Sequence, residues 1–172
     1  MKIFTTNAYS DGNYGKWMNE VMKASPCEWV MFHDHDIYLA NRNWYKIVSD
    51  AIEANPDGGL FTCVTNRIGN AYQKVKIPDK RNNDIKYHMQ MAEQIELREP
   101  KIIDLTNCPK KISGLMMVTS KTAWAKTLSG FREKGGYVGV DNCYHGAIKN
   151  AGYKIYLMNN LYVYHWYRGS TK

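Results

Sequence analysis

The first 65 residues alternate between short apolar runs and longer amphipathic stretches, and this alternation constrains the fold more than any other feature. The apolar runs predict strands over residues 2–6, 28–33 and 60–64. Apolar side chains at helical spacing predict a helix over residues 13–24 and a second that follows Asn43 and stops at Asn55-Pro56. With right-handed crossovers, this β-α-β-α-β order predicts a parallel sheet that has helices on its faces.

The rest of the chain carries a similar mixture of strand and helix patterns. Its spacing predicts strands over residues 102–105, 112–119, 153–158 and 161–166, and helices over 84–97, 121–128 and 141–151. A glycine-rich basic loop is expected over residues 132–140. The length of 172 residues suits one domain with a substantial core, so we expect a single α/β domain over residues 1–172 with a mostly parallel central sheet.

Composition excludes several classes of protein. Hydrophobic residues make up 44% and charged residues 23%, which is typical of a globular chain. The net charge is +7, but the basic residues are scattered, so nucleic acid is not an expected partner and a phosphate-bearing ligand is compatible. Four widely spaced cysteines favour a reducing, cytoplasmic location over a disulfide or zinc framework. No signal peptide or membrane span is expected.

Two acids, Asp34 and Asp36, directly follow the apolar run Trp29-Val30-Met31-Phe32. They therefore stand at the carboxyl end of a predicted buried strand, where open α/β sheets bind ligands. Carboxylates at positions i and i+2 lie roughly 6.5 Å apart, and their repulsion is about 2–3 kcal/mol at an effective dielectric of 20. A hard divalent cation would relieve that repulsion, although both acids could instead cap a turn or face solvent.

Four segments resemble GT-A-fold glycosyltransferases of the family 2 type, in particular small phage and bacterial members related to majastridin. The first is Gly15-Lys-Trp-Met-Asn19 with the run that ends in Asp34-His-Asp36, and the second is Ser113-Gly114-Leu115-Met116. The third is Gly139-Val-Asp141 with the helix that ends at Ala151-Gly152, and the fourth is Tyr162-Val-Tyr-His165. The resemblance extends over most of the chain from Asn13 to Trp166, with the motifs in the family order.

The resemblance implies a role for each acidic motif residue. Asp36 would bind Mn²⁺ or Mg²⁺ together with His165, and Asp34 would contact the donor and lie close enough to join the metal site. A carboxylate beside an imidazole suits Mn²⁺ better than Mg²⁺. Asp141 would be the general base that takes the proton of an acceptor hydroxyl, and its place at a helix N-terminus favours the ionised form. Asp141 could also be only a helix cap, and His165 only a core histidine.

Other candidates for binding the donor are less specific. Gly114 would shape the donor and acceptor pocket by resemblance. Lys16 could meet phosphate or be plain helix surface, and Arg67 could reach the donor or belong to a structural turn. Only about thirty residues precede Asp34, so Asn7 and Tyr9 are the expected substitutes for the missing part of the nucleotide-base pocket.

The predicted function is therefore transfer of a sugar from a nucleoside diphosphate donor, with a UDP-sugar favoured and the acceptor unknown. Inversion by direct displacement, with Asp141 as base, is the expected course. Two alternatives stay open. A metal-dependent phosphoesterase or nuclease could use the cluster His33-Asp34-His35-Asp36, and a nucleotide- or glycan-binding module could keep the fold without turnover.

Overall fold

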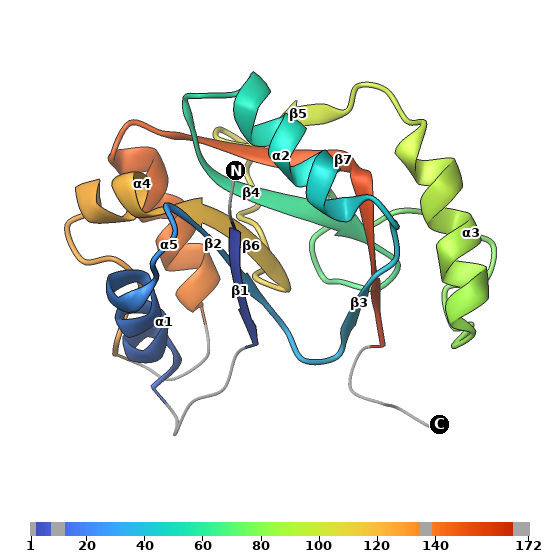
Figure 1. Ribbon diagram of the computed structural model, residues 1–172, viewed down its shortest axis with the longest axis horizontal. Helices are drawn as coiled ribbons and strands as arrows, with labels where there is room; N and C mark the ends of the chain where they lie inside the picture. The colour runs from blue at the N-terminus through green and yellow to red at the C-terminus, as the bar shows by residue number, and fades with distance from the viewer. Residues whose placement is uncertain (1–2, 8–12, 135–138, 167–172) are drawn as a thin grey trace.

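The computed structural model describes residues 3–7, 13–134 and 139–166, and within these ranges the chain forms seven strands and five helices. The strands are β1 (Ile3–Asn7), β2 (Trp29–His33), β3 (Ile37–Leu39), β4 (Gly58–Thr65), β5 (Ile102–Asp104), β6 (Met116–Ser120) and β7 (Lys154–His165). The helices are α1 (Tyr14–Ala24), α2 (Trp44–Ala54), α3 (Ile85–Glu96), α4 (Lys121–Lys126) and α5 (Val140–Asn150). Figure 1 shows their arrangement.

All seven strands belong to one mixed sheet. Its order is β1-β2-β6-β4-β7-β3, and β5 pairs with β7 beside that path. Two pairs, β1 with β2 and β4 with β7, are parallel. The other four pairs are antiparallel, and they join β2 to β6, β4 to β6, β3 to β7 and β5 to β7.

The prediction of a mostly parallel, Rossmann-like GT-A sheet flanked by helices is therefore wrong. The chain does alternate strands and helices as expected, but β2 and β4 are not neighbours, because β6 lies between them and runs the opposite way. The antiparallel strand β3, which the sequence pattern did not predict, adds a further edge. Periodicity identifies a strand but not its direction, and the direction of β6 depends on partners far away in the sequence.

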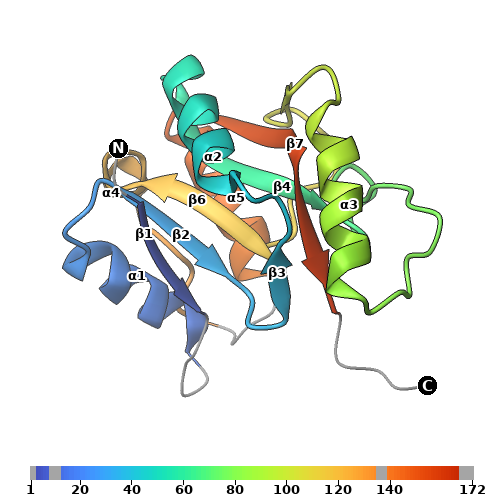
Figure 2. The same ribbon diagram turned by 45° about the vertical axis from the view of Figure 1, so that its right-hand side comes forward.

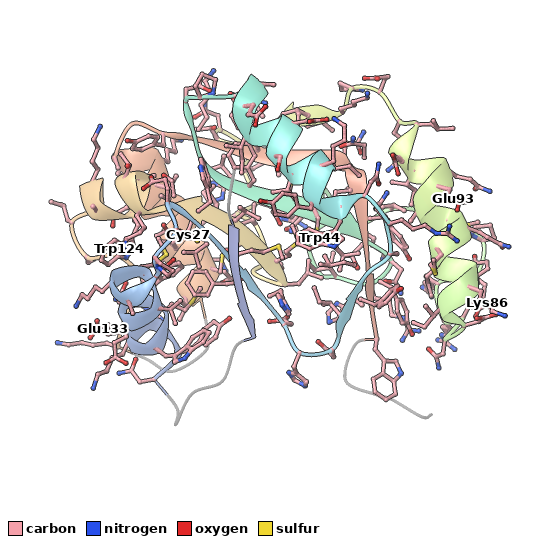
Figure 3. The ribbon with its side chains drawn as sticks, viewed as in Figure 1. Cys27, Trp44, Lys86, Glu93, Trp124 and Glu133 are labelled. Carbon is pink, nitrogen blue, oxygen red and sulfur yellow. The ribbon has the colours of Figure 1, made fainter. Side chains whose placement is uncertain are left out.

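Helices cover both faces of the sheet. One apolar cluster joins buried side chains of α1, α3 and α5 to the sheet, and the other joins α2 to the opposite face. In Figure 1, α1, α4 and α5 gather at the β1–β2–β6 end, whereas α3 lies along β7 at the other end. The outer side of α3 carries exposed charges such as Lys86 and Glu93, which point away from the sheet (Figure 3).

The helix bounds lie close to those predicted, because apolar spacing is a local signal. The last two predicted strands are instead one strand, β7. Its register against β4 shifts where Cys63 pairs with Met158 and the next residue, Val64, pairs with Tyr162. The polar pair Asn159-Asn160, which the sequence pattern indicated as a break between two strands, lies at that irregularity.

The directions of the strands set the position of the candidate site. The strands β1, β2, β4 and β7 all run the same way, so their carboxyl ends reach one edge of the sheet. The antiparallel strands β3 and β6 begin at that same edge. Figure 2 shows the segment that joins β2 to β3 at this edge, close to the end of β7.

Candidate metal centre

Asp34 and Asp36 lie on the short connection between β2 and β3. The backbone N–H of Asp34 donates to the carbonyl oxygen of Leu115 at 2.9 Å, just before β6. The carbonyl oxygen of Asp36 accepts from the N–H of Trp166 at 2.9 Å, just after β7. The connection is thus fixed at one end to the start of β6 and at the other to the end of β7.

These two acids and His165 form one compact cluster. One potential ligand atom from each of the three side chains lies within 4.8 Å of the others. Nε2 of His165 is 3.4 Å from Oδ2 of Asp36, and the two side chains are only 10% and 15% exposed. The structure therefore brings together the three residues that were predicted from the sequence motifs to bind a metal.

The imidazole of His165 is oriented by its other ring nitrogen. Nδ1 lies 2.7 Å from the carbonyl oxygen of Arg67, and a carbonyl can only accept, so Nδ1 carries the proton in this contact. In its neutral form, a ring held in this way would present the Nε2 lone pair on the side of Asp36. Histidine ligands of metals commonly donate the second ring N–H to a carbonyl in this manner.

Asn66 and Arg67 hold the end of β7 in place. The buried side chain of Asn66 accepts the His165 N–H at 2.8 Å and donates to the His165 carbonyl at 3.3 Å. The Arg67 guanidinium donates to the carbonyls of Lys80 at 2.7 Å and Trp166 at 3.3 Å. Arg67, predicted to reach the donor, therefore ties two backbone segments together behind the cluster.

Asp141 lies near the cluster, across the dipeptide Gly114-Leu115. It is in the first turn of α5, where its Oδ2 accepts the Gly114 N–H at 2.8 Å and its Oδ1 accepts the Asn142 N–H at 2.7 Å. The next residue, Leu115, accepts the N–H of Asp34. Two consecutive residues, Gly114 and Leu115, therefore position Asp141 and Asp34. A Cβ on Gly114 would lie 2.9 Å from the Cβ of Asp141, so this approach requires glycine.

Several carboxyl groups bring negative charge close together at this site. Burial raises the pKa of the Asp34 carboxyl above its ordinary value, and repulsion from Asp36 raises it further. The charge of Asp141 also raises the pKa of Asp34, while His165 and His35 lower it. A bound cation would offset this repulsion, which is the physical requirement that the spacing of the two acids had suggested.

Other predicted site residues lie elsewhere or outside the described residues. Lys16 is on the exposed side of α1, where its ammonium lies 3.9 Å from Glu20, so this position favours the surface interpretation. Tyr9 and the side chain of Asn7 lie outside the described residues, although the backbone of Asn7 ends β1 beside His33.

Gly15 and Asn19 have a role that sequence reasoning missed. The amide oxygen of buried Asn19 accepts from the Phe131 N–H at 2.8 Å and from the Trp124 indole at 3.0 Å. Its amide nitrogen donates to Phe131 O and to Glu133 Oε1, both at 2.9 Å. Trp124 and Glu133 accordingly lie close to α1 in Figure 3.

A Cβ on Gly15 would collide with the carbonyl oxygen of Arg132. The Gly15…Asn19 motif therefore holds the segment 131–133 against α1. The spacing of four residues, which puts both on one helix face, was the available signal.

An open cleft of about 330 Å³ adjoins the cluster on its other side. It lies between the start of β3, the N-terminal end of α3 and the end of β7. Its walls are formed by His35, Asp36, Ile37, Tyr38, Asn83, Ile85, Tyr164 and Trp166. Sequence reasoning did not identify this cleft, although Tyr164 and Trp166 alternate along the chain and so share one side of β7 and its extension.

Comparison with known protein families and with curated proteins gives no match to this chain. Within the described residues, no helix has the length and apolar character needed to cross a membrane. The four cysteines are not joined in disulfides.

Proposed function

We propose that this protein is a metal-dependent glycosyltransferase that moves a sugar from a nucleoside diphosphate donor, most favourably a UDP-sugar, to an acceptor hydroxyl. The observation that carries the proposal is the convergence of Asp34, Asp36 and His165 within 4.8 Å, with Asp141 held nearby through Gly114. The four segments that resemble family 2 glycosyltransferases are the same segments that supply these residues. A cytoplasmic location remains the expected one.

The potential ligand atoms of the cluster suit a Mn²⁺ or Mg²⁺ ion. Two carboxylates and one imidazole provide hard oxygen and borderline nitrogen ligands, and the Arg67 carbonyl fixes the imidazole tautomer. Asp36 and His165 would hold the ion, with Asp34 beside them. When bound, the ion would supply Lewis-acid stabilisation of the negative charge that builds on the departing diphosphate.

Two aspartates of the chain would carry out the other steps of the reaction. Asp34 would position the donor sugar, and Asp141 would accept the proton of the acceptor hydroxyl. The hydroxyl oxygen then forms a bond to the anomeric carbon from the face opposite the diphosphate. As that bond forms, the bond from the anomeric carbon to the diphosphate oxygen breaks and its electron pair leaves with the nucleoside diphosphate, so configuration inverts.

Replacement of Asp141 tests the proposed base. We expect Asp141→Asn to reduce sugar transfer, or hydrolysis of a UDP-sugar as its surrogate, by on the order of 100-fold or more, because the amide cannot accept a proton. The amide oxygen can still accept the Gly114 N–H, so Mn²⁺-dependent UDP binding should stay within about twofold by calorimetry. Cys143→Ser, exposed on the same helix, is the matched control and should turn over normally. Wild-type turnover by Asp141→Asn would refute the assignment.

The two alternatives receive less support from the geometry. A phosphoesterase built on His33-Asp34-His35-Asp36 needs the histidines as ligands, but among the described residues the cluster contains neither of them. Nδ1 of His33 instead contacts the Asp34 carbonyl at 2.9 Å. Release of phosphate from a generic diester would favour the phosphoesterase. Metal-dependent nucleotide binding without any donor turnover would favour the binding module.

A further inference from the structure

We propose that the open cleft beside Asp36 holds the nucleobase of the donor, so that the nucleoside lies between β3, α3 and the end of β7 and not beside the end of β1. This inference rests on the proposed function, because it takes a nucleoside diphosphate as the ligand of the cluster. It replaces the expectation that Asn7 and Tyr9 form the base pocket.

The order of the groups along the edge of the sheet gives the direction of the donor. Asp34 and Asp141 are held by the consecutive residues Leu115 and Gly114, at the start of β6. Asp36 and His165 lie at the junction of β3 and β7, where Ile37 pairs with His165. The cleft begins at Asp36 and continues away along β3 and α3, and neither Asp34 nor Asp141 belongs to its wall.

A nucleoside diphosphate sugar has its diphosphate between the sugar and the nucleoside. If the diphosphate lies at Asp36 and His165 and the anomeric carbon lies toward Asp141, then the nucleoside must extend to the opposite side of the cluster. The cleft is the concave surface at that position. Its volume of about 330 Å³ lies at the lower end of the range for small-molecule pockets.

The walls of the cleft have the chemistry of a nucleobase pocket. Tyr38 is 40% exposed and Trp166 is 51% exposed, so both rings have accessible surface for stacking on a planar base. The Asn83 amide oxygen accepts from the Tyr164 hydroxyl at 2.9 Å. The amide nitrogen of Asn83 therefore points away from that hydroxyl, and it is a donor suited to the carbonyl oxygens of a base.

The wall formed by Tyr164 is supported from behind by a buried histidine. The ring of buried His88 stacks on that of Tyr164, with 3.8 Å between the ring centroids. Nδ1 of His88 lies 2.8 Å from the Tyr162 hydroxyl and Nε2 lies 2.7 Å from the Asn82 carbonyl, so contacts at both nitrogens fix this imidazole. A prearranged aromatic wall reduces the ordering cost of binding a planar ligand.

Binding of nucleoside diphosphates and of pyrophosphate to the same variants separates the base from the diphosphate. UDP, GDP and dTDP would each be titrated with Mn²⁺ into the full chain by calorimetry, with Mn²⁺-pyrophosphate as the probe that lacks a base. The variants are Tyr38→Ala, Trp166→Ala and the control Tyr72→Ala, whose ring is 43% exposed but lies outside the cleft wall.

For the tightest of the three nucleotides, we expect each cleft variant to weaken binding roughly 5- to 150-fold, which corresponds to the loss of one stacking contact. Pyrophosphate binding and the Tyr72→Ala protein should stay within about twofold of wild type. Circular dichroism would verify that each variant is folded.

Three results would overturn the inference. The nucleotide could bind both cleft variants as tightly as wild type, pyrophosphate could weaken in parallel, or no nucleotide could bind more tightly than pyrophosphate. Weakened binding of an oligosaccharide acceptor, with nucleotide affinity unchanged, would assign the cleft to the acceptor instead. None of these results excludes glycosyl transfer. That proposed function is refuted separately, if the protein turns over no nucleotide sugar in the presence of Mn²⁺.

Discussion

At the scale of single residues, the site depends on two adjacent backbone positions. Gly114 donates to the Asp141 carboxylate, and Leu115 accepts from the N–H of Asp34. The glycine was predicted as a pocket-shaping residue by resemblance alone. The structure supplies a physical reason, since a side chain at Gly114 would press on the Cβ of Asp141, which cannot swing away as a flexible side-chain terminus could.

Gly114→Ala should therefore displace Asp141 while leaving the metal cluster in place. We expect turnover to fall by on the order of 100-fold, because misplacement of a catalytic group by about 1 Å has effects of this size. Mn²⁺-dependent UDP affinity should change little, and the melting temperature should fall by a few degrees at most. The control is Gly69→Ala, because an added Cβ there meets nothing within 4 Å. Equal turnover by the two alanine variants would contradict this role for Gly114.

The residues that could be predicted were those whose chemistry is rare at their position. Two acids directly after a buried strand, and a histidine at the end of the last one, carry a signal that does not depend on the exact topology. Asn19, Asn66 and Arg67 act through backbone groups that are distant in the sequence, so their roles could not be read without the fold.

At the scale of secondary-structure elements, the sequence predicted which segments form helices and strands far better than how the strands pair. The helix α5 illustrates the local part, because its apolar side follows helical spacing and its start lies at Gly139, which has a positive φ of 76°. The strand β3 illustrates the rest. It has only three residues, so its alternation is too short to detect.

The position of α5, and hence of Asp141, is further fixed by a buried histidine. His145 on α5 is 2% exposed, and its Nδ1 accepts the Ile112 N–H at 3.3 Å. Burial, together with the positive charges of Lys111 and Lys149, lowers the pKa of His145 to about 4. Between pH 6.5 and pH 4 the unfolded chain therefore takes up a proton at His145 that the folded chain does not.

The free energy of unfolding should consequently fall as the pH drops through that window. The loss of unfolding free energy that His145 causes is roughly 3 kcal/mol when complete at low pH, and there is no such loss above about pH 7. His145→Gln keeps an acceptor for the Ile112 N–H but cannot titrate. Urea unfolding at pH 7 and at pH 4.5 should show a smaller drop in stability for the variant than for wild type. Identical drops would mean that His145 is not kept neutral by the fold.

At the scale of the whole molecule, the sheet edge gathers the chemistry of four distant segments. The strands β2 and β7 deliver the cluster, the start of β6 supplies Gly114, and α5 brings Asp141 beside it. The prediction of ligand binding at the carboxyl ends of the strands does not require an all-parallel sheet. Here β2, β4 and β7 still share a direction, and the antiparallel strands β3 and β6 begin at the same edge.

The charge of the molecule also separates the site from its surroundings. The chain carries a net charge of +7, whereas Asp34, Asp36 and Asp141 concentrate negative charge at one place. A protein of net positive charge attracts an anionic donor over long range, and the acidic cluster accommodates that anion only when a cation lies between them. Metal binding is therefore the claim on which the other assignments depend.

The most direct test is calorimetric titration of Mn²⁺ into wild-type protein, Asp36→Asn and His35→Ala, without nucleotide. The last variant is the matched control, because His35 neighbours Asp36 in sequence but is not part of the cluster. We predict that wild type and His35→Ala bind one Mn²⁺ per chain with equal affinity, and that Asp36→Asn binds at least tenfold more weakly. Equal Mn²⁺ affinity in wild type and Asp36→Asn would contradict the assignment of a metal centre to this cluster.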